Sequence, residues 1–134
     1  MSTEAIQLNY LPRLPERTDV RIGCIGSGFI MADCQLVAYG AAGITPLGIS
    51  SRTRDRAAEV ATRHGIPRVY NDDRELLADD DFEVIDIAVP PDCQADVIRD
   101  VVKRTNIRGI LAQKPLGVDL SEAKEIVAMC DAAN

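Results

Sequence analysis

The sequence has no tryptophan, few aromatic residues (4%) and no uncharged apolar run near the roughly 18 residues that a membrane span needs. We therefore expect no membrane-spanning segment. Nor do we expect a signal peptide between Met1 and Asp19, where the apolar stretch of a secretory signal is missing. Hydrophobic residues make up 46% and charged residues 27% of the chain, which excludes disordered and collagen-like classes and predicts one globular domain in 134 residues.

Cysteine and histidine are too few and too scattered for a metal or redox motif. The four cysteines, Cys24, Cys34, Cys93 and Cys130, form no Cys-x-x-Cys pair, so we expect free thiols, a cytoplasmic location and no bound metal. The single histidine, His64, closes a predicted helix, where it suits the role of a C-terminal cation better than that of a catalyst. The net charge of −6 argues against nucleic acid as the main partner.

Short apolar runs alternate with helical patterns along the chain after residue 19. The runs predict strands at residues 20–25, 44–50, 68–70, 84–89 and 109–112. The helical patterns predict helices at residues 29–39, 55–64, 72–77 and 91–105, and from residue 119 onward. Such alternation with short connections is typical of an α/β, doubly wound parallel sheet (Rossmann fold), with the expected strand order 3-2-1-4-5.

Glycine is concentrated at the first strand-to-helix turn, where Gly23, Gly26 and Gly28 form a Gly-x-x-Gly-x-Gly pattern. A dinucleotide pyrophosphate needs backbone N–H groups and a helix N-terminus with no Cβ in the way. Gly26 permits the turn and Gly28 lets a phosphate approach the backbone, whereas Met31 takes the place of the usual third glycine. The motif predicts a dinucleotide site; a tight turn without a ligand is the alternative.

The second predicted strand ends without the acidic residue that usually binds the ribose 2′-hydroxyl of NAD. Ser51 and Arg52 stand there instead. Because a guanidinium binds phosphate in a bidentate fork, these residues favour NADP, or use of both NAD and NADP. The alternative is a solvated arginine at the start of the next helix.

Lys114 follows the fifth predicted strand. Ligands of doubly wound sheets bind beyond the carboxyl ends of the strands. Partial burial of a lysine at this point would poise its ammonium for proton transfer. A surface lysine in a loop is the alternative.

Four motifs follow one another in a fixed order along residues 20–134. They are Gly-x-Gly-Phe-Ile after the first strand, Ser-Arg-Thr after the second, Ala88-Val89-Pro90-Pro91 after the fourth, and Gln113-Lys114-Pro115-Leu116 after the fifth. Together they resemble the glucose–fructose oxidoreductase/inositol dehydrogenase (Gfo/Idh/MocA) family. This chain departs from the family pattern at Gln113 (usually Glu), Val89 (usually Thr) and Gln94 (commonly His).

The resemblance implies a two-domain NAD(P)-dependent oxidoreductase, whose C-terminal substrate domain is absent from these 134 residues. It implies that Lys114 is catalytic, because the family's lysine contacts the nicotinamide ribose and the substrate hydroxyl. The motifs and the resemblance together give the expected cofactor-binding residues: Gly26, Ser27, Gly28, Phe29, Ile30, Ser51, Arg52, Ala88, Val89, Pro90, Gln113 and Lys114.

We therefore interpret residues 1–19, with Pro12 and Pro15, as an extended arm and residues 20–134 as the NAD(P)-binding half of an oxidoreductase. The expected partner is a sugar- or polyol-like alcohol, with no nucleic acid or membrane partner, and we expect the full-length protein to be a homo-oligomer. We expect the isolated fragment to be inactive. The alternatives are a non-catalytic dinucleotide sensor, which needs no lysine at the nicotinamide end, and an S-adenosylmethionine-dependent transferase, which leaves the Lys-Pro unexplained.

Overall fold

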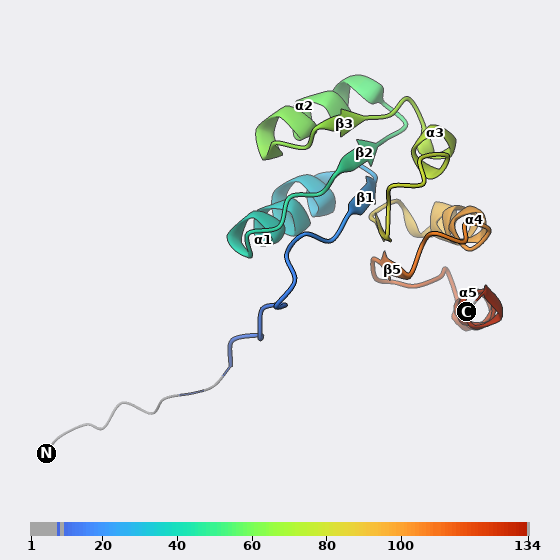
Figure 1. Cartoon of the computed structure of the whole chain (residues 1–134). Coiled ribbons are helices and arrows are strands. Elements are labelled where there is room, and N and C mark those ends of the chain that lie inside the picture. The colour runs from blue at the N-terminus through green and yellow to red at the C-terminus, as the bar shows by residue number, and fades with distance from the viewer. Residues whose placement is uncertain (1–7, 9, 134) are drawn as a thin grey trace, which may run out of the picture.

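The computed structural model describes residue 8 and residues 10–133 (Figure 1). Its strands are β1 (Ile22–Ile25), β2 (Gly48–Ser50), β3 (Arg68–Val69), β4 (Val84–Ile87) and β5 (Gly109–Ala112). They form one sheet in the order β3-β2-β1-β4-β5, and every pair of neighbouring strands is parallel. The predicted fold class and strand order are confirmed.

Helices cover both faces of this sheet. They are η1 (Ile30–Gln35), α1 (Leu36–Ala41), α2 (Arg54–His64), α3 (Asp73–Leu77), α4 (Pro91–Val101) and α5 (Leu120–Ala133). Figure 1 shows α1 and α2 on one side of the sheet and α3, α4 and α5 on the other. Within the described residues, none of these helices combines the length and hydrophobicity needed to cross a membrane.

Successive residues of β1 enter two separate hydrophobic cores. Cys24 packs into the core that α1 and α2 cover, together with Met31, Leu36 and Ile49. Ile25 packs into the core on the opposite face, with residues of α3, α4 and α5. All four residues of β1 are buried, as expected for the central strand of a doubly covered parallel sheet. The cores fix the strands and hence the loops at their carboxyl ends.

The first helical run differs from the α-helix predicted at residues 29–39. Its opening turn is a π-helix, in which the backbone N–H of Leu36 donates to the carbonyl of Met31, five residues earlier. Because of this spacing, Met31 and Leu36 both face the core, with exposed fractions of 0% and 2%. The apolar residues Ile30 and Val37 are exposed instead. A pattern based on 3.6 residues per turn does not reveal such a wide turn.

Several predicted elements are shorter in the structure. The strand predicted at residues 44–50 begins only at Gly48, because Pro46 has no N–H to donate to a neighbouring strand. The other shortened elements are β1 (Ile22–Ile25, not 20–25), β3 (Arg68–Val69, not 68–70), β4 (Val84–Ile87, not 84–89) and α4 (Pro91–Val101, not 91–105).

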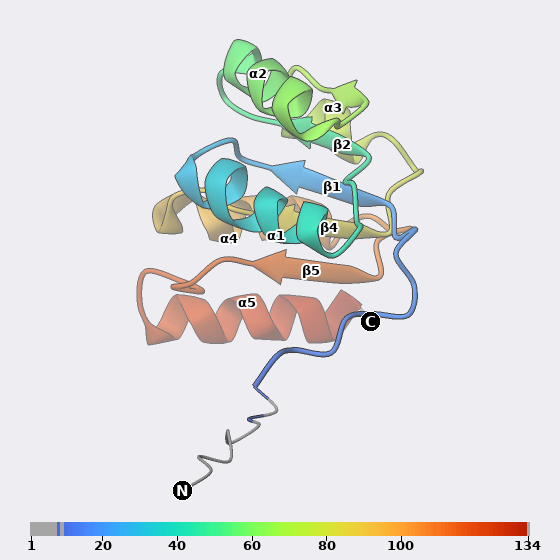
Figure 2. The ribbon, with the colours of Figure 1, turned by 90° about the vertical axis from the view of Figure 1, so that its left-hand side faces the viewer.

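The predicted arm is described only in part, since residues 1–7 and 9 lie outside the described residues. Residues 10–21 contain no helix or strand, and Figures 1 and 2 show their first part leading away from the sheet. The side chains of Tyr10 and Leu14 are exposed. These two side chains of the arm therefore add nothing to either core, whereas Val20, just after the arm, packs against the core that α1 and α2 cover.

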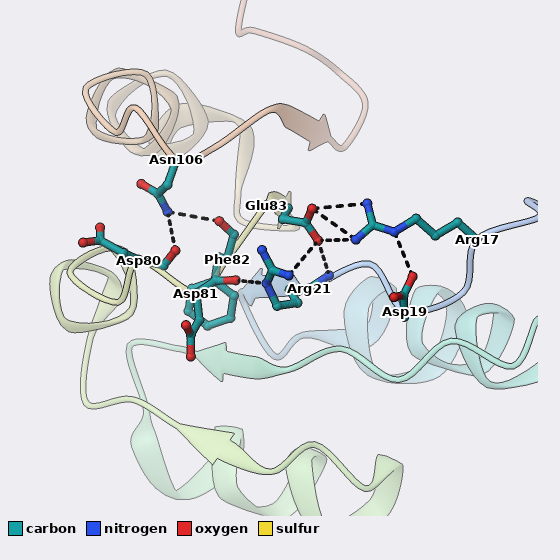
Figure 3. Close-up of polar contacts among 8 residues, drawn as sticks. All are labelled: Arg17, Asp19, Arg21, Asp80, Asp81, Phe82, Glu83 and Asn106. Atoms are coloured by element: carbon teal, nitrogen blue, oxygen red, sulfur yellow. Dashed lines mark hydrogen bonds and ion pairs between the residues drawn. The ribbon is translucent and has the colours of Figure 1, made fainter.

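Two arginines anchor the end of this segment at the amino end of the sheet (Figure 3). The Arg17 guanidinium donates to both carboxylate oxygens of Glu83, at 3.2 Å to Oε1 and 2.9 Å to Oε2. The backbone N–H of Arg21 donates to Oε2 of the same carboxylate at 3.2 Å. The Arg17 hydrogen bonds, followed by that of Arg21, lower the pKa of Glu83 from its usual value. Glu83 precedes β4, so these hydrogen bonds lie at the amino ends of the strands, whereas the predicted cofactor site lies at their carboxyl ends.

Candidate cofactor-binding cleft

The carboxyl ends of β1, β2 and β4 meet at the edge of the sheet where parallel α/β proteins bind their ligands. A cleft of about 280 Å³ opens there, between loops from three separate parts of the chain. The structure thus brings together the predicted residues of segments 26–28, 51–52 and 88–90. The cleft is lined by Ile25, Gly26, Ser27, Gly28, Ser51, Arg52, Thr53, Arg56, Asp73, Ala88, Val89, Pro90, Cys93 and Val97.

The turn after β1 accepts only glycine at its first position. Gly26 has φ = +107°, and a Cβ at this residue would lie 2.3 Å from the carbonyl oxygen of Ala88. A Cβ at Gly28, by contrast, would meet nothing within 4 Å. Gly26 therefore makes the turn, and the space beside Gly28 is open. That a phosphate approaches the backbone at Gly28 stays a prediction.

Ser27 joins this turn to the loop that follows β2. Its hydroxyl donates to the hydroxyl oxygen of Ser51 at 2.8 Å, and its carbonyl oxygen accepts from Nε of Arg56 at 3.1 Å. Arg52, on the same loop, and Arg56 both line the cleft, which therefore carries two arginines. Arg56 lies in the first turn of α2, and no motif of the sequence pointed to it.

Asp73 is the only carboxylate among the lining residues of this cleft. It lies at the start of α3, and its Oδ1 accepts a hydrogen bond from the buried hydroxyl of Ser50 at 2.8 Å. Partial burial, and then the negative charges of Asp72 and Asp100, raise the pKa of Asp73 above its usual value, although the Ser50 bond opposes this. No motif pointed to Asp73, because its place in the cleft depends on how α3 packs beside β2.

Four predicted cofactor residues are not in the lining of this cleft. Phe29 and Ile30 are 65% and 36% exposed at the start of the helical run. Gln113 and Lys114 follow β5, which forms the edge of the sheet beyond β4. Lys114 is exposed, so the partial burial expected for its side chain is not found in this chain. The reason is that β5 has no neighbouring strand on its outer side within the described residues.

The loop that carries Lys114 is nevertheless fixed by hydrogen bonds from the side chain of Gln94. Gln94, on α4, is only 1% exposed. Its Nε2 donates to the carbonyl oxygens of Gln113 (2.9 Å), Pro115 (3.1 Å) and Leu116 (2.8 Å). The Gln113 side chain accepts from the backbone N–H of Lys114 at 3.0 Å, and the peptide bond between Lys114 and Pro115 is cis. Gln94 thus links the loop after β5 to the helix that borders the cleft.

The remaining candidate residues lie elsewhere. His64 ends α2, with Nε2 at 2.7 Å from the carbonyl oxygen of Ala32, and it does not line the cleft. The four cysteines are free thiols. Across residues 8 and 10–133, no three His, Cys, Asp or Glu side chains are grouped so that they would hold a metal ion.

Comparison with known proteins identifies an oxidoreductase family with an NAD-binding Rossmann fold, Gfo/Idh/MocA, whose pattern matches residues 20–134. D-xylose 1-dehydrogenase (NADP(+)) 2 of Haloferax volcanii is 31% identical over 111 residues, which cover 83% of this chain and 34% of that protein.

Two solved structures are similar to this fold. A 3-ketoreductase from Actinomadura kijaniata, KijD10, in complex with NADP and TDP-benzene, has a TM-score of 0.75 and 28% identity, covering 85% of this chain and 34% of that one. An oxidoreductase from Agrobacterium radiobacter, in complex with NAD+, L-tartaric acid and magnesium, has a TM-score of 0.77 and 30% identity, covering 87% and 33%. The chain spans about one third of the length of these relatives.

Proposed function

Because this chain belongs to the Gfo/Idh/MocA family of oxidoreductases, with its NAD-binding Rossmann fold, we propose that it is the NAD(P)-binding part of an enzyme that transfers hydride between the nicotinamide and a sugar- or polyol-like alcohol. The observation that carries the proposal is the cleft itself, where Gly28 leaves the backbone open beside two arginines. A xylose dehydrogenase among the relatives and L-tartaric acid in a structural neighbour support a hydroxyl-rich substrate.

The residues of the cleft suit the parts of the cofactor. Ser27 and Gly28 would hold the pyrophosphate with their backbone N–H groups, since no Cβ blocks the approach at Gly28. Gly26 would shape the turn around it, because its own N–H donates to the carbonyl oxygen of Ser50 at 2.9 Å. Arg52 and Arg56 would bind a ribose 2′-phosphate, which the missing acid at the end of β2 leaves unopposed. This charge pattern supports NADP, or both cofactors. The nicotinamide, when bound, supplies the hydride chemistry.

Lys114 is the group in this chain that we propose for proton transfer. It stands beyond β5, next to the strands whose ends form the cleft, on a loop that Gln94 fixes. Its side chain is exposed here, so the surroundings that would desolvate it belong to the further length that the relatives have. In the whole enzyme its ammonium would stabilise charge as the alcohol proton leaves.

The test is the substitution Lys114→Met in the whole enzyme, assayed by the reduction of NADP+ and NAD+ with a panel of aldoses and polyols. We expect kcat to fall by at least about 10²-fold, the lower range for general acid–base catalysis, with a much smaller change in cofactor affinity. Lys114→Arg should not restore the rate, because a guanidinium does not release its proton near neutral pH.

Lys103→Met is the matched control. Lys103 lies just beyond the carboxyl end of α4, away from the cleft, and makes only an exposed ion pair with Asp100. Its loss should leave kcat unchanged. If Lys114→Met kept most of the wild-type kcat, the lysine would be a positioning or surface residue, and the proposal would lose its only proton-transferring group in this chain.

A further inference from the structure

The cleft has a polar pattern that phosphate binding alone does not explain. Its arginines, Arg52 and Arg56, are donors that suit a phosphate. Its two serines, Ser27 and Ser51, already bond to each other. Asp73 remains: it is an ionised acceptor that would repel a phosphate, yet it lines the same space. An acceptor in this position suits a ligand group that donates a hydrogen bond.

Asp73 is held in place and still has an oxygen free. Ser50 is fully buried at the end of β2, and its hydroxyl donates to Oδ1 of Asp73 at 2.8 Å. In the described part of the chain, no donor contacts Oδ2, and neither arginine of the cleft forms an ion pair with this carboxylate. One carboxylate oxygen is therefore fixed by the protein and the other is left for a ligand.

The surroundings of Asp73 suit a flat ring better than a sugar hydroxyl. The ribose is expected at the tip of β2, at Ser51 and Arg52. Asp73 instead bonds to Ser50, one residue further inside the sheet, and the same cleft has an apolar wall that includes Ile25 and Val97. An apolar wall with one acceptor fits a purine whose edge carries an amino group.

We propose that Asp73 is a specificity-determining residue that recognises the base of the dinucleotide, its Oδ2 accepting a hydrogen bond from the exocyclic amino group of adenine. This inference rests on the proposed function, since it assigns a further part of the same cofactor to the same cleft. The raised pKa of Asp73 is consistent with it, because a donor from the ligand offsets the cost of keeping a partly buried carboxylate charged.

The experiment compares NADP+ with its deamino analogue, in which hypoxanthine replaces adenine and a carbonyl oxygen replaces the amino group. Both are titrated into the wild-type chain and the Asp73→Asn variant by calorimetry. An acceptor facing an acceptor leaves both unpaired, so the wild type should bind the analogue at least about tenfold more weakly. In Asp73→Asn, the side-chain amide can either accept or donate a hydrogen bond. The ratio of the two dissociation constants, that of the analogue divided by that of NADP+, should therefore fall to about two or less.

Asp72→Asn is the matched control, since it removes the same charge one residue away. Asp72 caps α3 by accepting from the N–H of Glu75 at 2.8 Å, a role that Asn fills equally well, and it does not line the cleft. This variant should keep the wild-type ratio, and thermal melting should show that both variants are folded. A wild-type ratio near one, or an unchanged ratio in Asp73→Asn, would overturn the inference while leaving the proposed function intact. A wild type that binds neither compound overturns both.

Discussion

The role of Gly26 can be predicted from the residues next to it in the sequence, whereas the role of Asp73 cannot. Gly26 is recognisable from the sequence, because its positive φ and its approach to Ala88 are consequences of a turn that the motif encodes. Asp73 and Arg56 reach the same cleft only because α3 and α2 pack beside β2, and no local pattern records that packing. Lys114 is in the predicted loop, but the burial expected of it needs groups that this chain does not supply.

At the residue scale, Arg52 is predicted to decide the cofactor preference. Its guanidinium lines the cleft and donates no hydrogen bond within the described residues, so it is free to bind a phosphate. A charge-assisted hydrogen bond is worth about 1.5–3 kcal/mol, so Arg52→Ala should weaken NADP+ binding by about tenfold or more and change NAD+ binding little. Calorimetric titration of both cofactors measures this.

Arg54→Ala provides the control for Arg52, because Arg54 is an exposed residue at the start of α2 that does not line the cleft. It should bind both cofactors as the wild type does. A wild type that binds NAD+ tenfold tighter than NADP+, or an Arg52→Ala variant with unchanged NADP+ affinity, would show that Arg52 is only a surface residue.

At the element scale, the sequence indicated the order and kind of the elements better than their turns and ends. The runs Ile22–Ile25 and Val84–Ile87, the second apolar except for Asp86, are buried apart from the half-buried Val84, which is why a parallel sheet was predictable from them. The π-helical turn before α1 was not, since Met31 and Leu36 are five residues apart and fit no standard period. Gln94 looked like a departure from the family pattern, yet it fixes the loop after β5.

The Gln94→Leu variant tests this element-level link. Leu fills nearly the same space but leaves the carbonyl oxygens of Gln113, Pro115 and Leu116 without their donor. Loss of the partner of a buried polar group costs about 1–3 kcal/mol, so the free energy of unfolding should fall by that amount. Urea denaturation measures it, and amide hydrogen exchange at Lys114, Leu116 and Gly117 should become faster.

A surface substitution on the same helix separates this effect from a general loss of α4. Asp96 is exposed on α4 and pairs only with Arg99, so Asp96→Asn should change the unfolding free energy by less than about 0.5 kcal/mol. If Gln94→Leu were as stable as Asp96→Asn, the three hydrogen bonds of Gln94 would not be what holds the loop.

At the scale of the whole molecule, the two ends of the sheet are specialised. At the amino ends of the strands, Arg17 and Arg21 bind the carboxylate of Glu83, so the charged groups there are paired with one another (Figure 3). At the carboxyl ends, the backbone N–H of Gly28, the Arg52 guanidinium and Oδ2 of Asp73 have no hydrogen-bond partner within residues 8 and 10–133, and all three residues line one cleft. This difference is a property of the fold, because parallel strands carry all their carboxyl ends to one edge.

The central claim is that this chain binds a nicotinamide dinucleotide in the cleft at the carboxyl ends of β1, β2 and β4. The most direct test is an NMR titration of the ¹⁵N-labelled chain with NADP+. Saturable changes in amide chemical shift are predicted at Ser27, Gly28, Ser51 and Val89, with none at Arg21 and Glu83 at the opposite edge. No saturable change, changes confined to other surfaces, or the same changes with S-adenosylmethionine but not with NADP+, would contradict the claim.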